Sequence, residues 1–541
     1  MPSHSVMKKT GTYADGLHAI GLAHLLRELT GAEWGIQDCG DRFEVASSSV
    51  DANAAWREPE PGFLYVWDSK REQTRPSWEV FDYRREVEKR DLAKVTPRRR
   101  MRAQLEAADV ALPDPPSPRL QLAAALSSMR KGWKSDRVLY QWLQADRARA
   151  LSWARKKLLN SDSAVVDPLW SNSQVLNPIT GKGIHNAKSQ FLAPNAFNAV
   201  LLDPFEEWLK LRALWVATLA YRDDGDYKFM TVMPGDIRIA DLNKIVDDLR
   251  RLNLWGGVKL DIQAVLRCAE LLIQHSDVLG GSIELRGRRP NQIIHGIRQA
   301  HFKSLGTASA LMNEALLGLP GWFNIKTPAD AELFISMVDG FIGSISAPGG
   351  CLGALDARKS DEGTSLQVFR NWLNTGERDE FLEFSARFAV HVLAKKAAGD
   401  WVLPMTVGLL DNLFDRGYGM NDVVNNEGFR SVARAIRNST IYSEKVGGPV
   451  KLDTRFGLAQ AWKQKLRAGK PELIMAAVAE FVQAYNWEVQ RGGISIHKVS
   501  TEDLDQLLNL MNGDHQTIAM LLLAYGYAVQ PKGAQNGEAA S

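Results

Sequence analysis

The sequence has little cysteine and no long apolar run. Its three cysteines, Cys39, Cys268 and Cys351, are far apart among the 541 residues. This spacing argues against a disulfide framework, excludes a four-cysteine zinc site and fits a reducing cytoplasm. The longest apolar runs, near 333–345 and 518–529, are too short to cross a bilayer. We therefore expect a cytoplasmic protein that makes no use of a membrane.

Catalytic signatures are also scarce. The ten histidines are scattered, and no HExxH or GxSxG motif is present. Asp223, Asp224 and Asp226 could together hold magnesium, but acidic residues between a helix and a strand are more typical of a hairpin turn. We expect no cofactor, no metal site and no catalytic residue. A metal-dependent enzyme that processes nucleic acid stays open as an alternative.

Positive charge, in contrast, is concentrated in one segment. Nineteen Lys and Arg stand against eight Asp and Glu from Arg84 to Lys157, a net charge of +11, whereas the whole chain carries +3. A cationic surface of this kind suits a polyanion, because each neutralised phosphate releases a condensed counterion. The other interpretation is a solvated helical face of mixed charge. Both stay open.

The hydrophobic pattern predicts an α+β protein. An N-terminal mixed α/β body over 1–345, with a basic helical insertion at about 78–160, is followed by an all-α helical bundle over 366–530. Residues 344–365 are rich in Gly, Ser and Ala, lack periodicity and predict a linker. Residues 531–541 predict a disordered tail.

Two segments of the N-terminal body have patterns typical of helices. Tyr13–Leu29 predicts an amphipathic helix that Gly31 ends. Ile293–Leu319 predicts a largely helical segment, despite Gly296 and Gly306.

Three places carry candidate phosphate-binding residues. The loop 177–188 resembles a P-loop, but Leu176 replaces the first glycine and Gly183 the magnesium-binding Ser or Thr, which argues against an NTPase. A Gly-Lys-Gly loop can still approach a phosphate. The turn 286–292 offers three arginines and an amide that could pair with a base edge. Trp133 lies between two lysines. The predicted nucleic-acid-binding residues are Lys131, Lys134, Lys182, His185, Asn186, Lys188, Arg286, Arg288, Arg289 and Asn291.

Each of these places also has a plainer interpretation. The two loops could be solvated turns with incidental charge, and the lysines beside Trp133 could lie on an exposed helix.

Five segments of the chain, in order, are similar to one known family. They are Tyr13–Ala23, Asn177–Gly183, Asp226–Asp236, His301–Gly306 and Phe481–Glu502. Together they resemble the large subunit of type I CRISPR effector complexes, called Cascade. The three scattered cysteines do not support the zinc-binding insertion that some members carry.

The resemblance implies a non-catalytic subunit in antiviral defence. Such a subunit contacts the crRNA 5′ end, inspects the PAM beside the target double-stranded DNA, supports the R-loop and recruits a helicase-nuclease. Its partners would be crRNA, target DNA, other Cascade subunits and the helicase-nuclease. Because guide pairing supplies the sequence specificity, a basic surface with a modest base reader suffices. A helical scaffold that binds proteins and no nucleic acid is a third hypothesis.

Overall fold

The structure is a computed structural model. It describes residues 3–50, 56–58, 65–70, 73–75, 80–95, 114–128, 147–158, 175–177, 203–223, 225–252, 254, 256–304, 309–400, 402–443, 452–492 and 496–530. These residues form an α+β protein, as predicted, with the strands in the N-terminal part and only helices and turns after Gly318, apart from isolated bridges. Contacts divide the chain into two compact units, 1–256 with 291–319, and 257–290 with 320–541.

The first unit contains two antiparallel sheets and a short parallel pair. The first sheet has the order β1-β3-β2-β8, the second β10-β9-β7-β6, and β4 pairs with β5. The strands are β1 (Ser3–Met7), β2 (Gly35–Asp38), β3 (Arg42–Ala46), β4 (Tyr65–Trp67), β5 (Val80–Asp82), β6 (Thr218–Asp223), β7 (Asp226–Pro234), β8 (Asp236–Arg238), β9 (Ile294–Ser304) and β10 (Ser309–Gly318). The helices are α1 (Tyr13–Thr30), α2 (Tyr83–Val95), α4 (Leu120–Ser128), α6 (Arg147–Leu158), α7 (Pro204–Ala217) and α8 (Ile239–Arg251).

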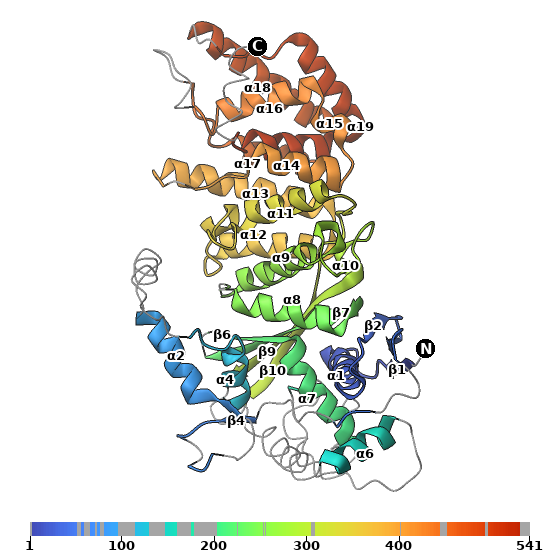
Figure 1. Ribbon diagram of the computed structural model, residues 1–541. Coiled ribbons are helices and arrows are strands. Elements are labelled where there is room, and N and C mark those ends of the chain that lie inside the picture. The colour runs from blue at the N-terminus through green and yellow to red at the C-terminus, as the bar shows by residue number, and fades with distance from the viewer. Residues whose placement is uncertain are drawn as a thin grey trace, which may run out of the picture. The chain divides into compact units, whose positions relative to one another are not determined.

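The predicted helix over 293–319 is wrong. These residues form the antiparallel strands β9 and β10, and β9 also pairs with β7 (Figure 1). Ile297, Ala300 and Phe302 are buried at the centre of the sheet. Ile294, Ile297 and Ala300 follow one another at three-residue spacing, which fits one face of a helix, so the local periodicity misled the prediction.

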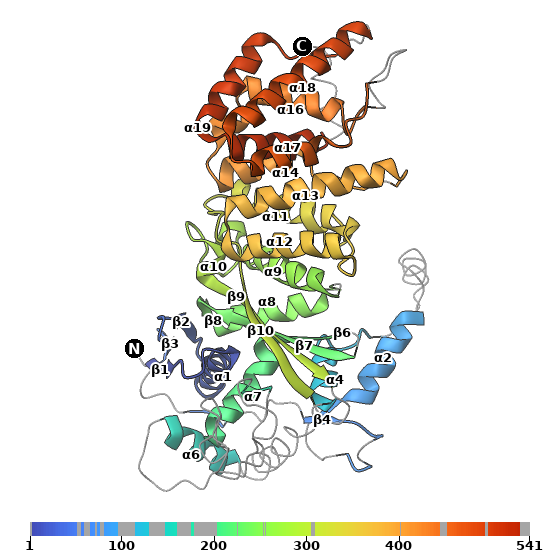
Figure 2. The same ribbon diagram turned by 180° about the vertical axis from the view of Figure 1, so that it is seen from behind.

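Helices α1 and α7 pack side by side (Figures 1 and 2). Helix α1 begins after Thr12, whose hydroxyl accepts from the Ala14 N–H, and ends at Gly31 in a left-handed conformation. Between these caps, Gly21 faces the backbone of Leu209, where a Cβ atom would lie 1.9 Å from the carbonyl oxygen. The predicted helix is therefore confirmed, and its glycine allows the close approach of α7.

The second unit is helical in its described part. Its helices form successive layers, with α9 against α12, α12 against α13, and α16 against α19 (Figures 1 and 2). They are α9 (Val258–Gln274), η3 (Asp277–Leu279), α11 (Pro328–Ile342), η4 (Cys351–Ala354), α12 (Ser360–Thr375), α13 (Arg378–Ala397), α14 (Val407–Asp411), η5 (Asn412–Gly417), α15 (Asn421–Val424), α16 (Glu427–Asn438), α17 (Leu458–Arg467), α18 (Pro471–Arg491) and α19 (Thr501–Gly526). The short α10 (Pro290–Ile293) begins with the last residue of one stretch of the second unit and continues into the first unit.

Residues 344–365 are ordered and do not form the predicted linker. Cys351, Leu352 and Leu355 are buried, and η4 and the first turns of α12 lie within the segment. The Gly349 N–H donates to the Ile342 carbonyl and so turns the chain directly after α11. The small residues here allow a tight turn of the backbone and do not form a flexible connection.

The compact units also differ from the predicted segments 1–345 and 366–530. Residues 257–290 and 320–345 belong with the C-terminal helices. The predicted tail 531–541 lies outside the described residues. No helix in the described part of the chain is long and apolar enough to cross a membrane.

Candidate nucleic-acid interface

The structure describes four of the ten predicted binding residues. Arg286, Arg288 and Arg289 belong to the second unit. Asn291 belongs to the first, where its carbonyl oxygen lies 3.2 Å from Nδ1 of His295 and its side-chain Oδ1 is buried. The other six residues lie outside the described ranges: Lys131, Lys134, Lys182, His185, Asn186 and Lys188.

The three arginines lie on one outward turn, residues 286–289, which we call the arginine turn. Leu285 before it is fully buried and Pro290 after it is also buried, so both ends are anchored in the protein. The side chain of Arg286 is 61% exposed. Gly287 has a φ of +78°, in the left-handed region that glycine adopts without strain.

Backbone hydrogen bonds hold the arginine turn in shape. The Arg288 N–H donates to the Leu285 carbonyl at 2.7 Å, and the Gly287 N–H donates to the Ile325 carbonyl at 2.9 Å. Lys326, exposed and next to Ile325, has no ion-pair partner among the described residues. The turn thus holds the exposed Arg286 and Arg289 on a fixed backbone, while Arg288 is half-buried and donates to the Glu284 carbonyl at 3.4 Å. Nothing in the local sequence of Lys326 singles it out as a neighbour of the turn.

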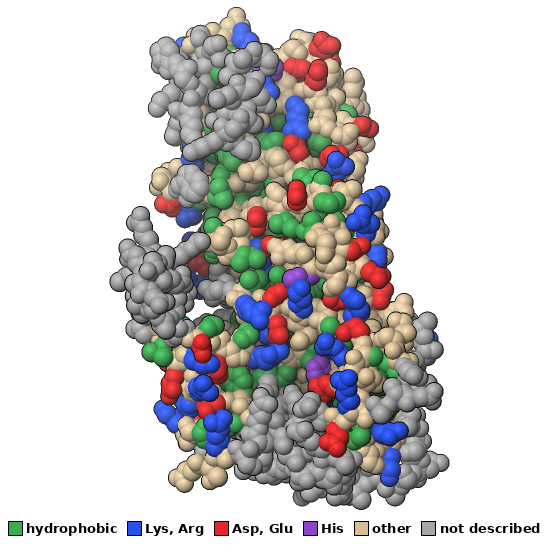
Figure 3. All heavy atoms as spheres, viewed as in Figure 1, with side chains coloured by type: hydrophobic (Ala, Val, Ile, Leu, Met, Phe, Trp, Pro, Cys, Tyr) green, Lys and Arg blue, Asp and Glu red, His purple; other side chains and the backbone are tan. Residues whose placement is uncertain are grey.

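In the structure, many cations of the basic segment 84–157 have carboxylate partners. Five of its described cations form ion pairs, namely Arg84–Asp68, Lys89–Glu86, Arg90–Asp91, Arg119–Asp247 and Lys157–Asp203. Arg155 lies over the ring of Trp56, 5.4 Å from its centroid. On the face drawn in Figure 3, cationic and anionic side chains are interspersed. In its described part, the segment's charge is therefore largely balanced by carboxylates.

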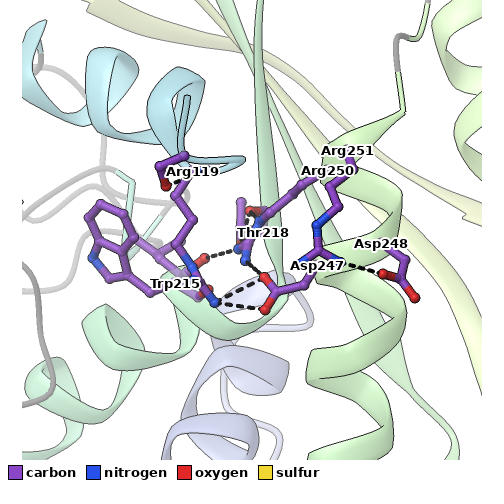
Figure 4. A network of polar contacts seen from close by, with 9 residues as sticks. Arg119, Trp215, Thr218, Asp247, Asp248, Arg250 and Arg251 are labelled. Carbon is purple, nitrogen blue, oxygen red and sulfur yellow. Dashed lines mark hydrogen bonds and ion pairs between the residues drawn. The ribbon is translucent and has the colours of Figure 1, made fainter. Parts of the chain in front are cut away.

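Arg119 shows most clearly how this balance is built (Figure 4). Its Nη2 lies 2.9 Å from Oδ1 of Asp247, and its Nε donates to the Trp215 carbonyl at 3.3 Å. Arg250 shares Asp247 at 2.8 Å and donates to the Thr218 carbonyl at 2.7 Å. Both guanidinium groups thereby satisfy carbonyls at the C-terminal end of α7, where a helix favours positive charge.

Burial affects the acid–base chemistry of this pair. Desolvation, followed by the neighbouring positive charge of Arg119, lowers the pKa of Arg250 to about 10. The guanidinium stays charged at neutral pH and needs its carboxylate partner. We conclude that Arg119 attaches α4 to the body and is not displayed to a ligand.

The start of the Gly-Lys-Gly loop is anchored in the first unit. Asn177 donates to Glu207 at 2.7 Å and accepts from Lys210 at 2.8 Å, all within the buried interior. Asp203, which follows the loop, caps α7 by accepting from the Phe205 N–H. Both flanks therefore meet the first turns of α7, and the phosphate-binding role of the loop stays a prediction.

The acidic cluster belongs to a hairpin. Asp223, the last residue of β6, lies opposite Asp226, the first residue of β7. Gly225 between them has a φ of +92°. Oδ2 of Asp226 lies 3.2 Å from Nε2 of His301, and Asp224 lies outside the described residues. Within the described ranges, no group of three or more His, Cys, Asp or Glu side chains is placed to hold a metal ion.

No protein-family model matches the chain, and no curated protein is similar to it in sequence.

Proposed function

We propose that this protein is the large subunit of a type I CRISPR effector complex and binds nucleic acid without cutting it. In this role it contacts crRNA and target double-stranded DNA, helps to recognise the PAM, stabilises the R-loop and recruits the helicase-nuclease. The proposal rests on the family resemblance of the five sequence segments and on the arginine turn.

The arginine turn is the observation that carries the nucleic-acid role. Arginine forms bidentate hydrogen bonds with phosphate oxygens, and a turn that projects from two buried anchors can reach a backbone groove. Lys326 adds an exposed cation next to Ile325, whose carbonyl the turn contacts. The cations of segment 84–157 support the proposal less, because three of them lie 2.6 to 3.2 Å from a carboxylate, whereas Arg286 lies 3.9 Å from Asp277.

The test is a titration of labelled duplex DNA and of single-stranded RNA with the full chain at several salt concentrations. Replacement of Arg286, Arg288 and Arg289 together by Ala should weaken binding. It should also reduce the slope of log affinity against log salt by about 2 to 3, since each lost phosphate contact removes about 0.9 from the slope.

A matched variant separates the arginine turn from net charge. Arg358, Lys359 and Lys395 lie in the same unit and pair with Asp356, Glu362 and Asp400. Their joint replacement by Ala removes the same formal charge and should have a smaller effect. An equal loss in both variants would show that the arginine turn is not the contact surface.

The two alternatives give different results. A metal-dependent enzyme would cleave the labelled nucleic acid in magnesium or manganese and lose this activity on Asp226→Ala. A protein-binding scaffold would show no salt-dependent retention on heparin. Co-purification with a short RNA of uniform length, after co-expression with the neighbouring genes, tests the assembly itself.

A further inference from the structure

Asp277 contacts the arginine turn through its side chain. The residue begins η3, shortly after the end of α9. Its Oδ1 accepts from the Leu285 N–H at 2.9 Å and from the Arg286 N–H at 3.0 Å. Its own N–H donates to the Ile283 carbonyl at 2.8 Å. One carboxylate therefore joins the entrance of the turn to the segment that follows α9.

The carboxylate engages the backbone of the turn more closely than the side chain of Arg286. Oδ2 of Asp277 lies 3.9 Å from Nε of Arg286, which is beyond hydrogen-bond distance. On the other side of the turn, the Gly287 N–H donates to Ile325. Asp277 and Ile325 thus brace consecutive residues, and this arrangement fixes the backbone direction from which the arginine side chains project.

The negative charge of Asp277 also disfavours the binding of phosphate by the turn. Its side chain is 37% exposed, and its negative charge lies beside the cations that would meet the phosphate. By Coulomb's law alone, removal of this charge should strengthen the binding of a polyanion. A residue that positions the turn predicts the opposite result, because a loosened turn must be ordered again when it binds.

We propose that Asp277 is a positioning residue for the arginine turn, which it pre-organises for the phosphate backbone of a nucleic acid. This inference rests on the proposed nucleic-acid role of the turn. The hydrogen-bond acceptor at Asp277, and not its charge, is the feature that supports binding.

Two variants of Asp277 separate the acceptor from the charge. Asp277→Ala removes both, and it should weaken the affinity for a labelled duplex by a factor of about three to ten, although the protein becomes more positive. Asp277→Asn removes the charge but keeps an oxygen that can accept from Leu285 and Arg286. It should bind at least as tightly as the natural protein.

Amide hydrogen exchange gives a readout that does not depend on binding. In Asp277→Ala the amides of Leu285 and Arg286 should exchange faster than in the natural protein, and in Asp277→Asn they should stay protected. Asp505→Ala removes an exposed carboxylate of α19 in the same unit and serves as the charge-matched control. Thermal unfolding identifies any variant that has lost its fold.

The outcomes distinguish the inference from the proposed function. Tighter or unchanged binding by Asp277→Ala, or equal weakening by Ala and Asn, would overturn the role of Asp277 while the loss in the triple arginine variant still supports the turn. Unchanged binding by the triple arginine variant would overturn the proposed function itself.

Discussion

At the scale of single residues, α1 depends on glycines where other elements come close. A Cβ atom on Gly21 would lie 1.9 Å from the backbone oxygen of Leu209, whereas on Gly16 it would lie 2.3 Å from the terminal methyl of Met233. The backbone of α7 cannot move without disturbing its packing, but the end of a methionine side chain can rotate away. The two glycines therefore differ in how much a methyl group would cost.

Gly21→Ala should lower the free energy of unfolding by about 2 to 4 kcal/mol, because α1 and α7 must separate to admit the methyl group. Gly16→Ala, in the same helix, should cost less, about 1 kcal/mol. Urea unfolding followed by tryptophan fluorescence measures both. Equal losses would mean that the close approach of α7 does not limit the packing.

His18, also in α1, lies in an environment that changes the pKa of its ring. Burial lowers its pKa to about 4, although the Glu206 carboxylate opposes the shift. Burial similarly lowers the pKa of His24 to about 3, and Arg212 contributes in the same direction. Both rings are therefore neutral in the folded protein at neutral pH.

The first unit should lose stability as the pH falls from 6.5 towards 4. In this window the unfolded chain binds a proton at His18 that the folded protein does not, so the free energy of unfolding decreases with pH. A shift of this size corresponds to about 3 kcal/mol at full development and to no effect above pH 6.5. His18→Gln should flatten the pH dependence measured by urea unfolding. A profile that keeps its slope in this variant would contradict the assignment.

At the scale of elements, shared carboxylates attach the basic helices to the body. Asp247 on α8 accepts from Arg119 before α4 and from Arg250 on its own helix (Figure 4). The next residue, Asp248, forms an ion pair with Arg251, whose side chain is 61% exposed. We therefore expect the two adjacent aspartates to contribute very differently to the stability of the first unit.

Asp247→Asn should destabilise the first unit by about 2 to 4 kcal/mol, because two neighbouring guanidinium groups would lose their common carboxylate. Asp248→Asn is the matched control and should change stability by less than about 1 kcal/mol. Thermal unfolding of the two variants at one salt concentration decides between them. Similar losses would indicate that Asp247 does not anchor α4.

At the scale of the whole molecule, the chain crosses between its two compact units three times. Residues 257–290 join the helices that begin again at 320, and 291–319 return to the first unit as strands. An aromatic cluster in the second unit draws on this arrangement: Trp322 stacks on Trp372 with centroids 5.0 Å apart, and Phe341 lies 5.0 Å from Phe369. Its members come from both sides of residue 345.

A fragment over the predicted bundle, 366–530, should therefore not fold as a unit. It lacks Trp322, Phe341 and α9, so Trp372 would lose much of its packing. We expect helical far-ultraviolet circular dichroism, weak near-ultraviolet bands and strong binding of a hydrophobic dye. A sharp, cooperative thermal transition of the fragment would show that the bundle folds without the residues before 366.

The sequence by itself determined the α+β class and those helices whose signals are local. Thr327 with Asp330 and Ser500 with Asp503 form capping boxes at the start of α11 and α19, and Gly31 ends α1. These features depend on residues three or four positions apart, so local patterns are sufficient. The arginine turn was also recognisable, from its Gly and Pro among three arginines.

Only the tertiary structure decided the partners of distant residues. Arg119 meets Asp247, 128 positions away, and residues 293–319 form two strands because β7 is there to pair with the first of them. Asp277 likewise contacts the arginine turn only because folding brings Leu285 and Arg286 close to its carboxylate. A side chain's charge can be read from the sequence, but whether that charge is neutralised or offered to a ligand depends on which atoms folding brings within a few ångströms.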